Sequence, residues 1–93
     1  MLYLVTYDVS SDRLRERVSR VLEAFGARVQ GSVFEVRIPE SQLPELQASL
    51  SALFGGRMRR EVRVYPVCER CYGQAFAIGD VAAPVAAKGW LVL

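Results

Sequence analysis

The sequence predicts an α+β fold, in which two helices pack on one face of a four-stranded antiparallel sheet. Three observations lead to this prediction. Apolar runs rich in β-branched and aromatic residues alternate with segments whose apolar residues recur at helical spacing. Glycine and proline separate these segments. The chain has 93 residues, which is the size of a single domain.

The first two predicted elements are a strand and a helix. Residues 2–9 form a nearly continuous apolar run, which predicts a strand covered on both faces. Ser10 or Ser11 can cap the helix that follows, and Gly26 stops it. The apolar stripe of this helix recurs every three or four residues: Leu14, Val18, Val21, Leu22 and Phe25.

The middle of the chain predicts a hairpin, a second helix and a fourth strand. Residues 27–38 form two strands that meet at a turn over 30–32, and Pro39 ends the second strand. Apolar residues then recur at helical spacing over 41–54. The run 61–67 is the fourth strand. This βαββαβ order is that of a ferredoxin-like fold.

The C-terminal tail has no place in the basic four-strand sheet. It contains two short apolar pieces, 74–79 and 88–93. We expect one to extend the sheet edge and the other to pair with a partner subunit by strand addition. The chain is therefore one domain over 1–93, with 72–93 an extension involved in dimer pairing. Its hydrophobic content of 52% also favours a homodimer.

Composition excludes several classes of function. The chain has no histidine, which excludes histidine acid–base catalysis, histidine-containing triads and histidine-ligated zinc. Of its 12 basic residues only Lys88 is not arginine. This bias has two equally good explanations, which are phosphate binding by arginine and a biased genomic composition. No apolar run reaches transmembrane length, and the N-terminus does not resemble a signal peptide. We expect a cytoplasmic protein.

Asp8 is the first candidate functional residue. It lies near the C-terminal end of an apolar strand, where burying an unpaired charge is expensive. A helix-capping or turn carboxylate is one interpretation. The other is a Mg²⁺ ligand, because Mg²⁺ takes one or two carboxylates and completes its shell with water and phosphate oxygens. A two-fold dimer that brings both Asp8 residues to its axis would supply two carboxylates.

The arginines of the first helix are candidate phosphate ligands. Arg13, Arg15 and Arg17 lie in the helix that starts directly after Asp8. By helix spacing alone, a solvated face whose arginines pair with glutamates such as Glu16 is the favoured interpretation. Proximity to Asp8 favours nucleic-acid contact instead.

The loop before the fourth strand is a second basic segment. Arg57, Arg59 and Arg60 follow two glycines there, and they suit either plain surface or phosphate contact. Tyr7 and Phe34 are the aromatic residues that could stack on bases. Aromatic residues in such strands more often belong to the core, and the aromatic motif of an RNA-recognition domain is missing.

Cys68 and Cys71 are spaced as half of a zinc site, but no second pair completes it within the chain. Two chains together could assemble four cysteines. A thioredoxin-type site needs the motif after the first strand, at a helix start, and here it follows the last core strand. The favoured interpretation is a turn with one or two semi-buried thiols.

Three motifs together resemble one known family. They are YDVSSDRLRERV at 7–18, RVQGSVFEV at 28–36 and VRVYPVCERC at 62–71. In this order and spacing they closely resemble the second CRISPR-associated protein (Cas-two), the small subunit of spacer acquisition. The resemblance covers most of residues 1–71.

The resemblance implies a ferredoxin-like homodimer of CRISPR adaptation. The family is described as Mg²⁺-dependent endonucleases acting on RNA or double-stranded DNA, and as a non-catalytic bridge between two dimers of the CRISPR integrase (Cas-one). The family's metal-binding aspartate falls on Asp8. Five further positions fall on supporting residues: Tyr7, Arg15, Arg17, Arg28 and Phe34. The alternative function is a structural DNA-binding adaptor without catalysis.

Overall fold

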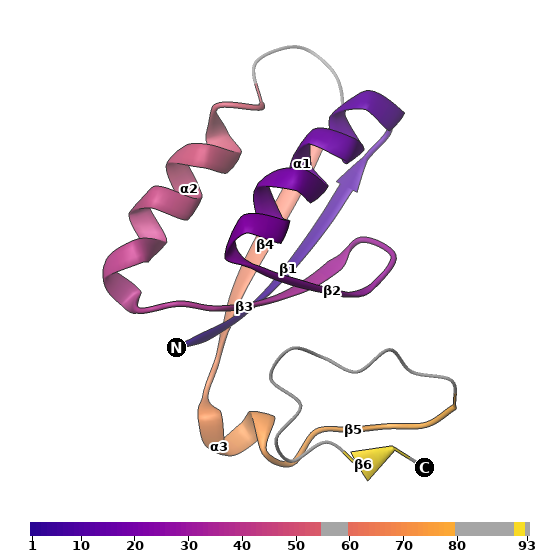
Figure 1. The fold of residues 1–93 in the computed structure, drawn as a ribbon, viewed down its shortest axis with the longest axis vertical. Helices are drawn as coiled ribbons and strands as arrows, with labels where there is room; N and C mark the ends of the chain where they lie inside the picture. The colour runs from indigo at the N-terminus through magenta and orange to yellow at the C-terminus, as the bar shows by residue number, and fades with distance from the viewer. Residues whose placement is uncertain (55–59, 80–90, 93) are drawn as a thin grey trace.

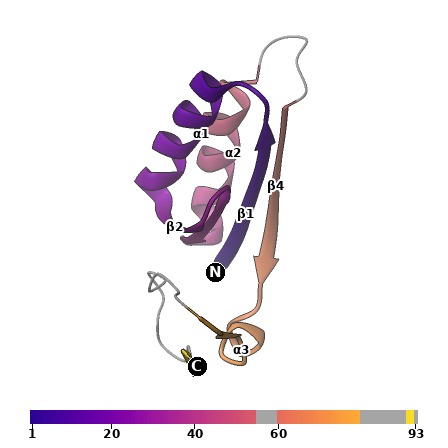
Figure 2. The same ribbon diagram turned by 90° about the vertical axis from the view of Figure 1, so that its right-hand side faces the viewer.

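The computed structural model describes residues 1–54, 60–79 and 91–92. A four-stranded antiparallel sheet of order β2-β3-β1-β4 carries α1 and α2 on one face (Figures 1 and 2). The predicted ferredoxin-like fold is confirmed. The elements have these bounds: β1 Leu2–Val9, α1 Asp12–Phe25, β2 Gly26–Gln30, β3 Val33–Arg37, α2 Leu43–Ser51, β4 Arg60–Val67, α3 Glu69–Tyr72, β5 Phe76–Ala77 and β6 Leu91–Val92.

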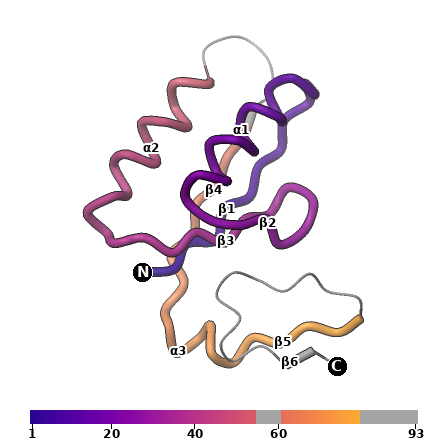
Figure 3. Tube along the Cα trace, viewed as in Figure 1, coloured from indigo at the N-terminus to yellow at the C-terminus, as the bar shows by residue number. Residues whose placement is uncertain are grey.

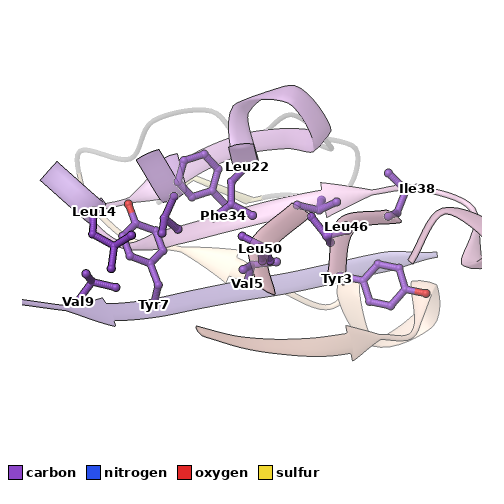
Figure 4. Packing of buried hydrophobic residues seen from close by; sticks show 12 residues of the cluster. Tyr3, Val5, Tyr7, Val9, Leu14, Leu22, Phe34, Ile38, Leu46 and Leu50 are labelled. Atoms are coloured by element: carbon purple, nitrogen blue, oxygen red, sulfur yellow. The ribbon is translucent and has the colours of Figure 1, made fainter. Parts of the chain in front are cut away.

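The core lies between the sheet and the two helices (Figure 4). Alternate residues of β1 face the helices, because side chains of a strand point to opposite sides in turn. Phe34 of β3 is fully buried at the centre. The helices contribute residues at helical spacing from α1 and α2: Leu14, Val18, Leu22, Leu46 and Leu50.

The other side of the sheet, which we call the open face, carries no helix of the four-strand unit (Figure 2). Along β1 it presents Leu2, Leu4, Thr6 and Asp8, and their exposure rises from buried Leu2 to exposed Asp8. The predicted cover on both faces is therefore incomplete within one chain. The reason is that α3, near the Leu2 end, is the one described helix that contacts this face.

Gly26 ends α1 as predicted, but for a different reason. Its backbone is extended (φ −166°) rather than left-handed, and it is already the first residue of β2. A Cβ at this position would lie 2.1 Å from the carbonyl oxygen of Glu35. The glycine is needed because β2 approaches β3 so closely. The left-handed glycine is Gly31 (φ 41°), in the hairpin turn.

The second helix is shorter than predicted. A 3₁₀ turn over Glu40–Gln42 precedes α2, and turn residues follow Ser51. Pro44 lies in the first turn of α2, where its missing N–H breaks no helical hydrogen bond. The apolar periodicity continues beyond the C-terminal end of the α-helix because turn residues such as Leu53 also pack on the core.

The tail differs from its prediction. β5 and β6 pair with each other in parallel and form a separate two-stranded sheet, so neither extends the main sheet in this chain (Figure 3). Residues 68–72 are not a simple turn either, because they form the capped helix α3. No helix in the described ranges is long and apolar enough to cross a membrane.

Candidate metal and nucleic-acid site

Asp8 is exposed on the open face, at the end of β1. It forms no hydrogen bond or ion pair with any residue that the structure describes. The cap of α1 is Ser11, whose Oγ accepts the N–H of Leu14 at 3.3 Å. Asp8 therefore does not cap the helix, so the helix-capping interpretation of this residue is wrong.

A second carboxylate lies directly opposite Asp8. Glu61 of β4 is its cross-strand partner, so both side chains belong to the open face. Like charges in this relation destabilise a sheet. Glu61 forms an ion pair with Arg63, two residues further along β4. Within the described part of the chain, no group of three or more potential metal ligands gathers.

A polar hollow of about 430 Å³ lies beside Asp8. Its walls come from the end of β1, from α1 and from the β2–β3 hairpin. The N–H of Tyr7 donates to the carbonyl of Ser32 at 3.1 Å, which holds the hairpin turn against β1. The polar side chains around the hollow include six residues: Asp8, Arg15, Glu16, Ser19, Arg28 and Ser32.

Arg28 is held in place at this hollow. Its Nη2 donates to the Oγ of Ser19, which in turn donates to Oε1 of Glu23 at 3.2 Å. The guanidinium also lies 5.2 Å from the ring centroid of Phe34, a cation–π distance. These contacts orient an exposed arginine without neutralising it directly. Ser19, a buried polar residue of α1, was missed because its position within an apolar helix face gives no sequence signal.

Tyr7 and Phe34 belong to the core, as the sequence favoured. Phe34 is 0% exposed and Tyr7 is 7% exposed, and their ring centroids lie 6.2 Å apart (Figure 4). Neither ring presents a face on which a base could stack. Both rings pack beneath the hollow, and the ring of Phe34 contacts the guanidinium of Arg28.

The arginines of α1 divide into two groups. Arg15 forms an ion pair with Asp12, a partner that the sequence did not suggest. Arg20 pairs with Glu16 at 3.2 Å, the kind of pairing with a glutamate that helix spacing predicts. Arg13 and Arg17 have no ion-pair partner among the described residues. Exposed pairs of this kind contribute about 0–1 kcal/mol, so a phosphate can readily replace the carboxylate.

The basic loop lies largely outside the described residues. Arg57 and Arg59 fall in the undescribed range 55–59, and Arg60 is the first residue of β4, where it pairs with Val9. The structure therefore brings Asp8, Tyr7, Arg15 and Arg28 to one hollow. Arg13 and Arg17 do not line it.

A larger groove of about 1000 Å³ lies between α2 and the strands β1 and β4. Its walls are mainly apolar, with Leu43, Val62 and Val64 among them, and Glu40 and Glu61 are the acidic residues that line it. None of the arginines in the described ranges lines it. Its chemistry does not suit a phosphodiester substrate.

Glu35 is a buried carboxylate that the sequence did not single out. It is 5% exposed on β3, and Tyr72 of α3 donates its hydroxyl to Oε1 at 3.1 Å. Desolvation raises the pKa of Glu35, while this hydrogen bond and the charge of Arg37 partly offset the rise. Arg37 also pairs with Glu69, so two residues of α3 contact β3.

Comparison with known proteins gives the family. The model described as CRISPR associated protein Cas2 matches residues 1–75. The chain belongs to the Cas2 family. The match spans β1 to α3 and ends just before β5. The family resemblance read from the three sequence motifs is thereby confirmed.

Individual Cas2 relatives are similar over most of their length. A Methanospirillum hungatei JF-1 protein named CRISPR-associated endoribonuclease Cas2 2 is 39% identical over 79 residues, which is 85% of this chain and 86% of the relative. The crystal structure of a hypothetical protein from Thermus thermophilus has a TM-score of 0.74 and 32% identity, and it covers 89% of this chain and 95% of that one.

A third similarity concerns an assembly. One chain in a structure described as a partial Cas6-RT-Cas1–Cas2 complex is 29% identical, with a TM-score of 0.66. The alignment covers 80% of this chain and 86% of that one.

Proposed function

We propose that this Cas2 protein is a Mg²⁺-dependent endonuclease of CRISPR adaptation that hydrolyses phosphodiester bonds of RNA or double-stranded DNA. The observation that carries the proposal is Asp8, an exposed carboxylate without a described partner beside a hollow flanked by arginines. Relatives named endoribonucleases support the reaction class.

The donor set fits a hard cation. Mg²⁺ takes one or two carboxylates and fills its other positions with water and substrate phosphate. Asp8 supplies one carboxylate, and either its cross-strand neighbour Glu61 or Asp8 of a second copy supplies another. A cation there would also relieve repulsion between like charges. Bound at this place, Mg²⁺ would act as a Lewis acid toward a phosphodiester oxygen.

The arginines of the hollow bind and orient the substrate. Ser19 and Phe34 hold the Arg28 side chain in one orientation. Its planar guanidinium therefore loses little conformational freedom when it binds a phosphate. Arg15 exchanges the Asp12 carboxylate for phosphate. Arg13 and Arg17 extend the positive surface along α1 and contact phosphates further along the strand.

The active form is a homodimer that assembles through the open face. Leu4 and Val33 are only half-buried there, and Tyr65 is 44% exposed. A second copy would cover these residues and bring a second Asp8 into the assembly. The extension 72–93 contributes to the pairing. The dimer in turn binds the CRISPR integrase.

One observation favours a second function, that of a structural adaptor without catalysis. The similar chain in the Cas6-RT-Cas1–Cas2 complex supports a place between integrase subunits. In this function the arginines track a DNA duplex, and Asp8 serves no chemistry.

Replacing Asp8 separates the two functions. Asp8→Asn keeps the size of the side chain and removes the charge that attracts Mg²⁺. As a nuclease, the variant should lose Mg²⁺-dependent cleavage by orders of magnitude while it folds and dimerises normally. The measurement is cleavage of RNA and duplex DNA with Mg²⁺ and with chelator, beside a spacer-integration assay with the integrase.

Glu45→Gln is the matched control, because it removes an equally exposed carboxylate from α2, away from the hollow. It should cleave like the wild type. Full cleavage by well-folded Asp8→Asn would refute the nuclease assignment. Lost cleavage with intact integration would show that one chain performs both functions, with Asp8 serving only the first.

A further inference from the structure

The two cysteines lie at the beginning of α3 rather than in a simple turn. Cys68 is the N-cap, and its Sγ accepts the backbone N–H of Cys71 at 3.2 Å. Both thiols are exposed, not semi-buried as predicted. The pair therefore lies at the start of a four-residue helix, which periodicity could not reveal, but it follows β4 rather than the first strand.

The two thiols have different environments. The pKa of the Cys68 thiol is lowered, chiefly because the backbone N–H of Cys71 donates to its sulfur. The S–H of Cys71 also donates to Cys68 and lowers this pKa further. The same side-chain contact raises the pKa of the Cys71 thiol. This division into an accessible thiolate and a neighbouring protonated thiol is the pattern of a Cys-x-x-Cys pair that exchanges disulfides.

We propose that Cys68 and Cys71 are a redox-active dithiol, which low-molecular-weight disulfides of the glutathione class oxidise to an intramolecular disulfide. Neither the family assignment nor the Asp8 chemistry requires this reaction. A structural metal site is a weaker interpretation, because two thiolates are half of the four ligands that zinc takes. No further potential ligand joins them among the residues described.

The reaction proceeds in two exchanges. The Cys68 thiolate attacks one sulfur of the small disulfide, whose S–S bond breaks, and the departing half leaves as a thiolate that takes up a proton. Cys71 then gives its proton to water and attacks Cys68 Sγ, which expels the second half. The protein loses two electrons and two protons, and the small disulfide becomes two thiols.

Oxidation acts on the contacts of α3 with the sheet. Glu69 and Tyr72 lie in the same helical turn as Cys71, and they bind Arg37 and Glu35 of β3. A bond between Cys68 and Cys71 restricts this turn and lowers the entropy that docking loses. The disulfide therefore holds α3 more firmly against the open face.

The first experiment titrates the full chain with mixtures of reduced and oxidised glutathione, followed by acid quenching, alkylation and intact mass measurement. We expect one two-electron transition to a species two hydrogens lighter, with little glutathione adduct. A stable adduct at either cysteine, or a disulfide between chains, would overturn the proposal.

Single variants test the roles of the two thiols. Cys68→Ser keeps an oxygen at the N-cap, so α3 retains its start while the attacking thiol is lost. Cys71→Ser should accumulate the mixed disulfide on Cys68 and react with an alkylating reagent at neutral pH several times faster than Cys68→Ser, because the accessible Cys68 thiol that accepts the Cys71 N–H has the larger thiolate fraction. Equal or reversed rates would overturn the assignment.

The coupling to α3 has its own test. If oxidation favours docking, weaker docking must disfavour oxidation, because linkage is reciprocal. Tyr72→Phe should therefore raise the ratio of oxidised to reduced glutathione needed for half-oxidation by about fivefold. Glu45→Gln removes an exposed carboxylate from α2, away from α3, and should leave the midpoint unchanged. An unchanged midpoint in Tyr72→Phe would refute the coupling.

Discussion

Removing one hydroxyl tests how α3 is held to the sheet. Tyr72→Phe deletes the donor to the buried Glu35 carboxylate and keeps the ring that lies 5.9 Å from the Arg37 guanidinium. A hydrogen bond to a charged group is worth about 1.5–3 kcal/mol. With an m-value of about 1.5 kcal/mol/M, the lower figure moves the urea midpoint by about 1 M.

The loss must depend on pH. Burial raises the pKa of Glu35 above its ordinary value of 4.5, so the folded protein binds its proton more tightly than the unfolded chain. Protonation of Glu35 therefore contributes to the free energy of unfolding. This contribution is fully present below the pKa that Glu35 has in the unfolded chain, and it is lost as the pH rises through the pKa that Glu35 has in the folded protein. The hydroxyl of Tyr72 limits this loss by stabilising the charged form. The substitution should therefore cost most at neutral pH and about 0.5–1.5 kcal/mol at about pH 4, where the acceptor is neutral.

Urea unfolding followed by circular dichroism, at neutral pH and at about pH 4, measures both values. Glu45→Gln is the control, since it changes an exposed carboxylate of α2, away from α3 and from the open face. It should change stability by less than about 0.5 kcal/mol. A Tyr72→Phe variant as stable as the wild type at neutral pH, or one whose loss grows toward low pH, would refute the reasoning.

Three further outcomes follow from the structure. Gly26→Ala should destabilise the protein by about 1–3 kcal/mol in thermal unfolding, because its Cβ meets the Glu35 carbonyl, whereas Gly31→Ala should cost about 1 kcal/mol from backbone strain alone; equal losses would count against the close approach. Arg28→Ala should reduce the slope of log affinity for duplex DNA against log salt by about one, and an unchanged slope would exclude a phosphate contact there. Deleting residues 86–93 should shift sedimentation toward monomer or cause aggregation, while an unchanged dimer would show that this segment is not needed for pairing.

Tertiary contacts determine the surroundings of several arginines that the sequence identifies as candidates. Arg15 and Arg28 are far apart in the chain, yet both line the hollow beside Asp8. Arg28 acquires its orientation from Ser19, which lies nine residues away on a different element. Such contacts join positions with no fixed spacing, and no periodicity predicts them.

The cysteine motif shows where local reasoning failed. A four-residue helix is too short to show a periodic pattern, so the sequence of residues 68–71 predicts only a turn. What supports this helix is its docking on β3 through Glu69 and Tyr72. Short helices need such tertiary packing because their own nucleation is unfavourable.

Local patterns in the chain predict the fold class, the order of the main elements, the core position of Phe34 and the family. These features depend on spacing of two or about 3.6 residues, on glycine and proline, and on motifs, all of which are local in the chain. Three features come from the folded arrangement alone: Glu61 opposes Asp8, Glu35 is a buried carboxylate, and β5 pairs with β6. Each of these depends on which strands and faces meet, and that is settled by packing between residues distant in sequence.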